Sequence, residues 1–171
     1  MACTEPKKMK HSRFPRNMEK ATIVKQLRDK VRDQYERAVA ALEGAREAAT
    51  GDDTKAENKY DTRGLEASYL AAGQASQADE LGRAMTALNT FEFPEFDFDD
   101  PIENGALVEV DSNGEVMHYL LSPAGGGLTL DLDDGGVVTV LGPASPLRQK
   151  MTGLMSGTTL ESPPLMILEV F

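Results

Sequence analysis

The sequence has no tryptophan, a single cysteine and no long run of apolar residues among its 171 positions. Aromatic side chains make up 6% of the chain and apolar residues 40%, which favours one or two small domains with a modest core. Cys3 has no partner within the chain, so a disulfide framework and a cysteine-based metal site are both excluded. No segment approaches the roughly 18 apolar residues of a membrane span, and residues 1–16 lack the apolar stretch of a signal peptide. We therefore expect a cytoplasmic protein without a membrane partner.

Familiar catalytic patterns are also missing. The sequence contains no HExxH motif, no CxxC pair and no phosphate-binding loop, and neither histidine stands in a Ser-His-Asp set. His11 lies in the polar N-terminal tail, and His118 is interpreted as a surface or packing residue of a strand. The AGGGL run at residues 124–128 has no GK[ST] helix start after it, so we interpret it as a hairpin turn. The sequence does not indicate an enzyme with an active site of its own.

The net charge of −10 is unevenly distributed along the chain. Residues 1–16 carry five basic residues and one acid, residues 91–104 carry six acids and no base, and residues 105–171 carry eight acids and two bases. A duplex DNA binder needs a basic face for phosphate contacts, which residues 105–171 lack. Any DNA-binding or RNA-binding role must therefore use the tail or residues 17–90, where the alternative is that the Lys and Arg residues simply form a solvated helix surface.

Residues 17–90 are predicted to form a long antiparallel coiled-coil hairpin. Asn17 can cap the first helix, and the GDDT turn at residues 51–54 is short enough to force the two helices to be antiparallel neighbours. At about 1.5 Å per residue, two helices of roughly 34 residues give a hairpin about 50 Å long, with its tip at residues 51–57. Apolar residues recur every three or four positions at Val24, Leu27, Val31, Tyr35, Ala38, Leu42, Ala45 and Ala49, and then at Leu65, Tyr69, Ala72, Ala75 or Ser76, Leu81, Met85 and Leu88.

After the hairpin, residues 91–104 are predicted to be a linker. Phenylalanines alternate with acids there, and Pro94 and Pro101 argue against a central strand. The four phenylalanines either pack under the base of the hairpin or join an edge strand; they are Phe91, Phe93, Phe96 and Phe98.

From Gly105 the apolar period changes to two, which is typical of strands. Strands are predicted at residues 107–110, 116–121, 127–132, 137–141 and 165–171, separated by the turn sequences SNG, SPAGGG and DDGG. Residues 145–152 are predicted to form a short helix with Ser145 as its cap and Pro146 in its first turn. The expected fold class is α+β, with a small antiparallel sheet in residues 105–171.

The acids of the hairpin tip have two interpretations. Asp52, Asp53 and Glu57 cluster at the start of the second predicted helix, where carboxylates are favoured by the helix dipole. They are also suitable ligands for Mg²⁺, which takes one or two carboxylates and keeps several waters. Too few ligands are present for an independent metal enzyme, so such acids would complete a metal site in another protein.

Two segments resemble the Gre family of bacterial transcription elongation and transcript-cleavage factors. They are GDDTKAENKYDTRGLEASYL at residues 51–70 and SPLRQKMTGLMSGTTLE at residues 145–161. The resemblance implies a hairpin of residues 17–90 and an FKBP-like domain of residues 105–171 that docks on bacterial RNA polymerase at the secondary channel. The hairpin then enters the channel as part of a monomeric factor. Its tip helps to hold a second Mg²⁺ shared with the polymerase, which hydrolyses the backtracked nascent RNA. Neither an enzyme activity of the factor itself nor prolyl isomerase activity is expected.

The residues implied by the resemblance follow from its alignment on Tyr60. Asp53 falls on the first acidic tip position, whereas the second falls on Ala56 with Glu57 one residue later. Either the turn is one residue longer and Glu57 takes the role, or the pair is broken and the protein regulates from the channel without stimulating cleavage. A third alternative is an adaptor outside transcription that uses the hairpin as a binding surface. Ser145, Pro146 and Leu147 either contact the polymerase or only begin a helix.

Overall fold

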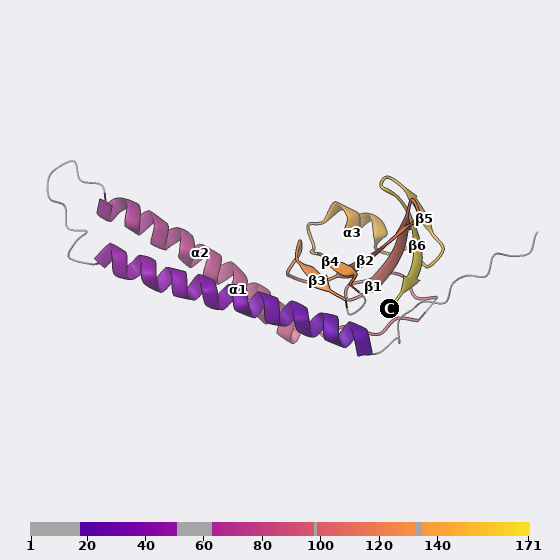
Figure 1. The fold of residues 1–171 in the computed structure, drawn as a ribbon, viewed down its shortest axis with the longest axis horizontal. Coiled ribbons are helices and arrows are strands. Elements are labelled where there is room, and N and C mark those ends of the chain that lie inside the picture. Colours follow the sequence, from indigo (N-terminus) through magenta and orange to yellow (C-terminus); the bar gives the residue numbers. More distant parts are fainter. Residues whose placement is uncertain (1–17, 51–62, 98, 133–134) are drawn as a thin grey trace, which may run out of the picture.

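The computed structural model describes residues 18–50, 63–97, 99–132 and 135–171. Two long helices, α1 (Met18–Thr50) and α2 (Arg63–Thr90), lie side by side and are followed by a six-stranded sheet with one short helix, α3 (Pro146–Met151) (Figure 1). The antiparallel helical hairpin and the α+β class are therefore confirmed. Among the described residues, no helix has the length and apolar character needed to cross a membrane.

The apolar stripe predicted for α1 is confirmed. Its members at Val24, Leu27, Val31, Ala38 and Ala45 are all buried. The spacing of three and four residues keeps these side chains on one face of the helix, where they face α2 and the sheet. The side chain of Ala49 lies outside the described residues.

The stripe predicted for α2 is right only in its second half. Leu88 is buried, and Leu81 and Met85 are half-buried. In the first half, Leu65 and Tyr69 are exposed to 56% and 71%, so the prediction that they face α1 is wrong. The residues turned inward there are mostly alanines, including the predicted Ala75, and lie at helical spacing: Ala67, Ala71, Gln74, Ala75 and Ala78. Apolar residues occur on more than one face of this helix, so their spacing alone does not identify the buried face. The face with alanines is the buried one, because alanine allows a closer approach to α1 than leucine does.

The sheet has the strand order β3-β4-β2-β1-β6-β5. Its strands are β1 (Leu107–Ser112), β2 (Glu115–Leu121), β3 (Thr129–Asp131), β4 (Val137–Leu141), β5 (Thr159–Glu161) and β6 (Pro164–Val170). All neighbours are antiparallel except β2 and β4, which run parallel with Leu120 opposite Val140. The sheet is therefore mixed rather than wholly antiparallel. The short edge strand β5 has too few apolar residues to be seen in the sequence.

Of two turns predicted from the sequence, one is confirmed and the other is wrong. The SNG turn joins β1 to β2 as expected, with Asn113 and Gly114 at φ values of 56° and 88°, the positive values that a tight hairpin turn requires. The AGGGL run is not a hairpin turn, because β2 and β3 are not paired. Its first glycine, Gly125, has a φ of 76° and lies so close to α1 that an added Cβ would be 2.8 Å from Leu27 Cδ1. Gly125 is thus required by close packing against the hairpin, whereas an added Cβ at Gly126 would meet the backbone of Gly142 at 2.8 Å.

Two apolar cores lie on opposite faces of the sheet. One is shared by the hairpin and the sheet and includes Ile23, Leu27, Val31 and Leu88. The other includes Met151 of α3, which lies on the side of the sheet away from the hairpin (Figure 1). The hairpin is therefore packed directly onto the sheet at its base.

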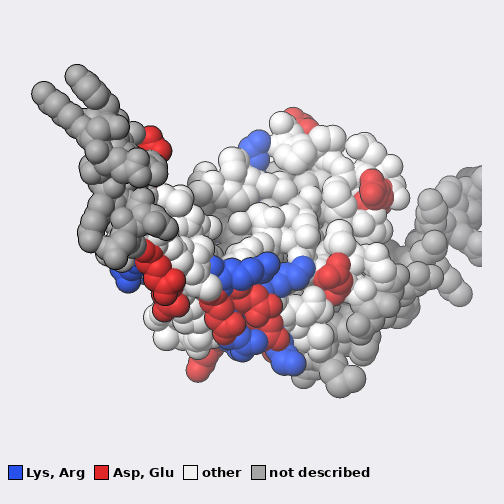
Figure 2. All heavy atoms as spheres, turned by 60° about the vertical axis from the view of Figure 1, so that its left-hand side comes forward, with Lys and Arg blue, Asp and Glu red and all other residues white. Residues whose placement is uncertain are grey.

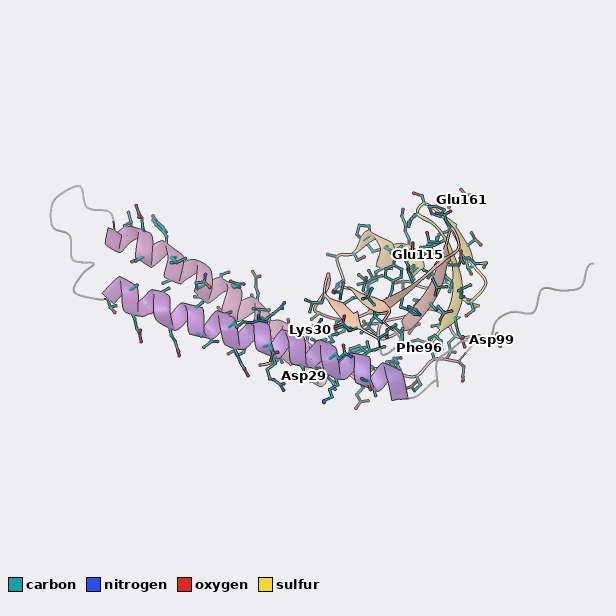
Figure 3. All side chains as sticks on the ribbon, viewed as in Figure 1. Asp29, Lys30, Phe96, Asp99, Glu115 and Glu161 are labelled. Atoms are coloured by element: carbon teal, nitrogen blue, oxygen red, sulfur yellow. The ribbon has the colours of Figure 1, made fainter. Side chains whose placement is uncertain are left out.

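The segment between α2 and β1 forms no strand in its described part, residues 91–97 and 99–106. The rings of Phe91 and Phe93 pack edge to face with centroids 4.9 Å apart, and Phe93 contacts the core shared by the hairpin and the sheet. Phe96, near the N-terminal end of α1 (Figure 3), packs against the second core, and the Nζ of Lys20 lies over its ring. Of the two alternatives, packing under the base of the hairpin is confirmed for Phe91 and Phe93, and none of the described phenylalanines joins an edge strand. Phe98 lies outside the described residues.

Candidate partner-binding surfaces

The direction of the hairpin is set first by a buried lysine at its base. Lys20 is only 2% exposed, and its Nζ donates hydrogen bonds to the backbone oxygens of Pro94 and Phe171, the latter at 2.8 Å. The ammonium also lies 4.9 Å from the centroid of the Phe96 ring. Burial lowers the pKa of Lys20 from 10.5 to about 8, and the nearby charge of Glu95 opposes this change. One side chain thus joins α1, the linker and the end of β6.

A second cation on α1 holds the end of α2. Arg28 Nε donates to the backbone oxygen of Leu88 at 3.1 Å, and Nη2 donates to that of Phe91 at 3.2 Å. Its guanidinium lies 5.8 Å from the centroid of the Phe93 ring. The last carbonyls of a helix have no partner within it and attract positive charge, so Arg28 stabilises the point where α2 becomes the linker.

Side chains of α1 also cover the outer edge of the sheet. Gln26 pairs with the backbone of Asp131 in edge strand β3, donating to its oxygen at 3.0 Å and accepting from its N–H at 3.2 Å. Lys30 Nζ donates to the backbone oxygen of Thr129 at 2.7 Å and lies on the sheet side of α1, whereas Asp29 points away (Figure 3). Edge strands need such cover against unwanted pairing. The base of the hairpin is consequently fixed to the sheet by several independent contacts.

The predicted docking segment begins α3. Ser145 is the N-cap, because its hydroxyl accepts a hydrogen bond from the Arg148 N–H at 3.3 Å, and Pro146 follows in the first turn. Pro146 is exposed, whereas Leu147 is half-buried against the second core. The helix start is thus confirmed in detail, and contact of these three residues with a partner stays a prediction.

Arg148 joins the start of α3 to two other segments of the domain. Its Nη1 donates to the backbone oxygen of Ser122 at 2.6 Å, and Nη2 donates to Asn104 Oδ1 at 3.3 Å. Burial lowers the pKa of its guanidinium. Because Ser122 begins the loop that contains the glycine run, Arg148 connects the start of α3 to that loop.

Two hollows border the glycine loop. One, of about 530 Å³, lies between residues 124–127 and 139–145 and is bordered by Ser145. The other, of about 740 Å³, lies between the same loop and the middle of the hairpin. The polar side chains that line the second hollow are Gln34, Arg37, Gln74, Gln77 and Glu80. The angle between the hairpin and the compact domain therefore forms a concave surface adjoining the predicted docking segment.

The predicted metal-binding acids of the tip, Asp52, Asp53 and Glu57, lie outside the described residues. Within the described ranges, no group of three or more His, Cys, Asp or Glu side chains is arranged to hold a metal ion. His118 of β2 lies opposite Glu109 of β1, with 3.3 Å between Nε2 and Oε2, and both side chains are largely buried. This pair agrees with the interpretation of His118 as a packing residue.

Sequence reasoning missed Lys20 and Arg28. The available signal for Lys20 was its position, four residues before Val24 and therefore on the buried face of α1. A lysine that continues an apolar stripe is an indication of a buried cation. Arg28 had no comparable signal, because its partners are backbone oxygens of a distant segment.

Comparisons with known proteins find similarity to several solved structures, including the following three. One is described as GreA factor homolog 1 (Gfh1) of Thermus thermophilus, at 18% identity and a TM-score of 0.34, covering 84% of this chain and 94% of that one. A second, the transcription factor Gfh1, has 22% identity and a TM-score of 0.34, with 85% and 94% covered. Thermus aquaticus Gfh1 has 19% identity and a TM-score of 0.33, again with 85% and 94% covered. No family model and no curated protein matches. With TM-scores this low, the similarities do not by themselves support a function.

Proposed function

We propose that this protein is a Gre-like factor that binds bacterial RNA polymerase and stimulates the polymerase to cleave backtracked RNA. The proposal assigns the hairpin to the secondary channel and the compact domain, through Ser145, Pro146 and Leu147, to the rim. It makes the protein an accessory factor rather than an enzyme. The tip residues Asp53 and Glu57, with Asp52 beside them, act as carboxylates that complete a Mg²⁺ site in the polymerase.

The observation that carries this proposal is the projection of the hairpin. Within the described residues, the core shared with the sheet extends along α1 only as far as Val31. From Val31 to Thr50 the helix continues for 19 residues, which at 1.5 Å per residue is roughly 30 Å. A solvated hairpin of this length gives nothing to the core of its own domain. It is suited to reach a site inside another molecule, and the sequence continues from Thr50 into the acidic segment that resembles the Gre family.

The division of tasks between factor and polymerase follows from the chemistry. Carboxylates favour the binding of a divalent cation, and a second metal ion stabilises the attacking and leaving oxygens of a phosphoryl displacement. The contacts of Lys20 and Arg28 fix the base of the hairpin, and so set the direction in which its described part leaves the domain that carries the docking segment. Loss of one tip carboxylate should therefore reduce the rate of RNA cleavage while leaving the affinity for the polymerase unchanged.

The test is RNA shortening in stalled elongation complexes. Wild-type protein should shorten the RNA in a Mg²⁺-dependent manner, and Asp53→Asn should lose at least about 90% of that activity while binding normally. Asn58→Asp, which adds an acid to the same segment, serves as a matched control for charge. Stalled complexes that bind the wild-type factor and keep full-length RNA would overturn the cleavage role.

A second candidate function is favoured by the register of the tip. Relative to the Gre pattern, Glu57 stands one residue late, which on a helix rotates a side chain by about 100°. A factor with a broken acidic pair would occupy the channel and alter initiation or pausing without stimulating cleavage. Competition with a cleavage-active Gre factor in the absence of RNA shortening is the result expected for this alternative.

A further inference from the structure

The guanidinium of Arg148 lies where the parallel strands β2 and β4 both end. Their last paired residues are Leu121 and Leu141, so the chain leaves the two strands at the same edge of the sheet. The backbone oxygen of Leu141 accepts hydrogen bonds from the N–H of Ser122 at 3.0 Å and from Arg148 Nη1 at 3.4 Å. Nη1 also donates to the backbone oxygen of Ser122 at 2.6 Å. One side chain therefore continues the hydrogen bonding between the two strands past their last pair.

The second arm of the guanidinium reaches a different segment. Nη2 donates to Oδ1 of Asn104, which precedes β1, at 3.3 Å. Ser122 is 0% exposed, so its backbone oxygen has little access to water and depends on the guanidinium. The planar fork of arginine can bind acceptors in two directions at once, which a lysine cannot do in the same way. The residue that follows Ser145, Pro146 and Leu147 thus joins them to two segments distant in sequence.

The surface around the predicted docking segment carries no charge of its own. Residues 121–130 and residues 137–147 include no charged residue, and they supply the lining of the hollow of about 530 Å³ that Ser145 borders. Figure 2 shows charged side chains of both signs gathered in a band on the α1 side of the molecule, with few on the visible face of the compact domain. Binding at this surface therefore depends on its shape, and a shape that is fixed beforehand costs less free energy on association.

We infer that Arg148 is a positioning residue for docking on the polymerase. It holds the start of α3 against the glycine loop, so that Ser145, Pro146 and Leu147 and the hollow beside them form one surface of fixed shape. This inference rests on the proposed function, which supplies the polymerase as the partner. Because Nη1 and Nη2 both donate to acceptors within the domain, Arg148 acts through the docking segment and does not itself bind the polymerase.

The first test compares variants of the full-length protein in stalled polymerase complexes. Arg148→Met keeps the apolar stem and removes the fork, and its affinity for the complexes should be about tenfold weaker. The concentration that gives half-maximal RNA shortening should rise by the same factor, whereas the maximal rate should not change, because the hairpin tip is untouched. Asn104→Ala leaves the guanidinium in place and removes only one of its acceptors, so its affinity should be about threefold weaker.

The matched control separates docking from general stability. Ile167 is 0% exposed and belongs to the same core as Leu147. Ile167→Val therefore lowers the stability of this core without touching the fork, and it should bind within about twofold of the wild type. A control that loses as much affinity as Arg148→Met would overturn the inference, since the effect would then follow from stability alone.

A double-mutant cycle distinguishes positioning from direct contact with the polymerase. The docking variant is Pro146→Ala/Leu147→Ala, which the proposed function expects to bind about tenfold more weakly. If Arg148 acts through these residues, adding Arg148→Met to the docking variant should weaken the affinity by less than about twofold more. A full further loss of about tenfold would mean that Arg148 acts independently of the docking segment, and would overturn the inference.

The remaining outcomes separate the inference from the proposed function. If Arg148→Met and Asn104→Ala bind as tightly as the wild type while the docking variant binds weakly, the inference is wrong and the proposed function stands. If the docking variant binds as tightly as the wild type, the assignment of the docking segment falls and the inference with it, although RNA shortening still tests the role of the hairpin. Wild-type protein that does not bind the polymerase overturns both.

Discussion

The two ends of the hairpin differ in where their large apolar side chains lie. At the base, large apolar side chains such as Leu27 and Leu88 are fully buried, and cations are bound to backbone oxygens. At the distal end the residues of α2 that face α1 are mostly alanines, and the large side chains Leu65 and Tyr69 face outward. The base therefore stabilises this molecule, whereas the distal end has a surface that its own fold does not use. The difference shows that the contribution of the hairpin to the stability of this fold is concentrated at its base.

The largest expected effect is a core truncation at the base. Leu27 is 0% exposed and contacts both the sheet core and the glycine loop. Leu27→Ala should lower the free energy of unfolding by about 2–5 kcal/mol, through lost burial and a residual cavity. Leu65→Ala, the same change at the distal end, should lower it by less than about 0.5 kcal/mol. Urea unfolding followed by circular dichroism measures both, and equal losses would show that the two ends do not differ.

The next effect concerns the buried cation Lys20. In the unfolded chain this lysine keeps its proton up to about pH 10.5, but in the folded protein it keeps it only up to about pH 8. Between these values unfolding takes up a proton, so the free energy of unfolding rises with pH, by about 3 kcal/mol in total. About 2 kcal/mol of that rise should fall between pH 7.5 and 9.5. This window also avoids Tyr119, whose pKa is raised by burial, so that its effect on stability has the opposite sign above pH 10.

Lys20→Met should remove this pH dependence while keeping the apolar stem of the side chain. Lys25→Met, an exposed lysine of the same helix, is the matched control and should keep the wild-type slope. Urea unfolding of the three proteins at pH 7.5 and pH 9.5 gives the comparison. A wild-type stability that is flat over this window, or a slope that persists in Lys20→Met, would contradict the assignment.

Patterns of residues next to one another in sequence predicted much of this fold. The helical periodicity of α1, the turn chemistry of Asn113-Gly114 and the Ser145 cap all depend on local preferences, and each prediction is confirmed. The parallel pairing of β2 with β4 and the position of Lys20 against Phe171 depend on contacts between distant segments, which periodicity does not encode. In α2 the pattern was ambiguous, because apolar residues occur on two faces. The acids of the tip stay a sequence-based prediction, since they lie outside the described residues.

The corrected seam of α2 gives a third, intermediate effect. Ala78 is 6% exposed and faces α1, whereas Ala72 belongs to the stripe predicted from the sequence but is exposed. Ala78→Leu should lower the free energy of unfolding by about 2 kcal/mol, because overpacking forces the helices apart. Ala72→Leu should change it by less than about 0.5 kcal/mol. Thermal or urea unfolding measures both, and the reverse ranking would restore the seam predicted from the sequence.

The smallest expected effect is at the junction of α2 and the linker. Arg28→Met removes the two hydrogen bonds to the backbone oxygens of Leu88 and Phe91 but keeps much of the packing against Phe93. Because the site is partly exposed and water can replace the guanidinium, the loss of unfolding free energy should be about 1 kcal/mol. Arg46→Met at the distal end removes an exposed arginine and should have no measurable effect. If both arginines contribute equally, charge on α1 stabilises the whole hairpin and the base is not distinguished by its bound cations. A loss confined to Arg28→Met would mean that the cations at the base stabilise the hairpin through the backbone oxygens that they bind. The charged residues at the distal end of α1 would then only keep that surface hydrated.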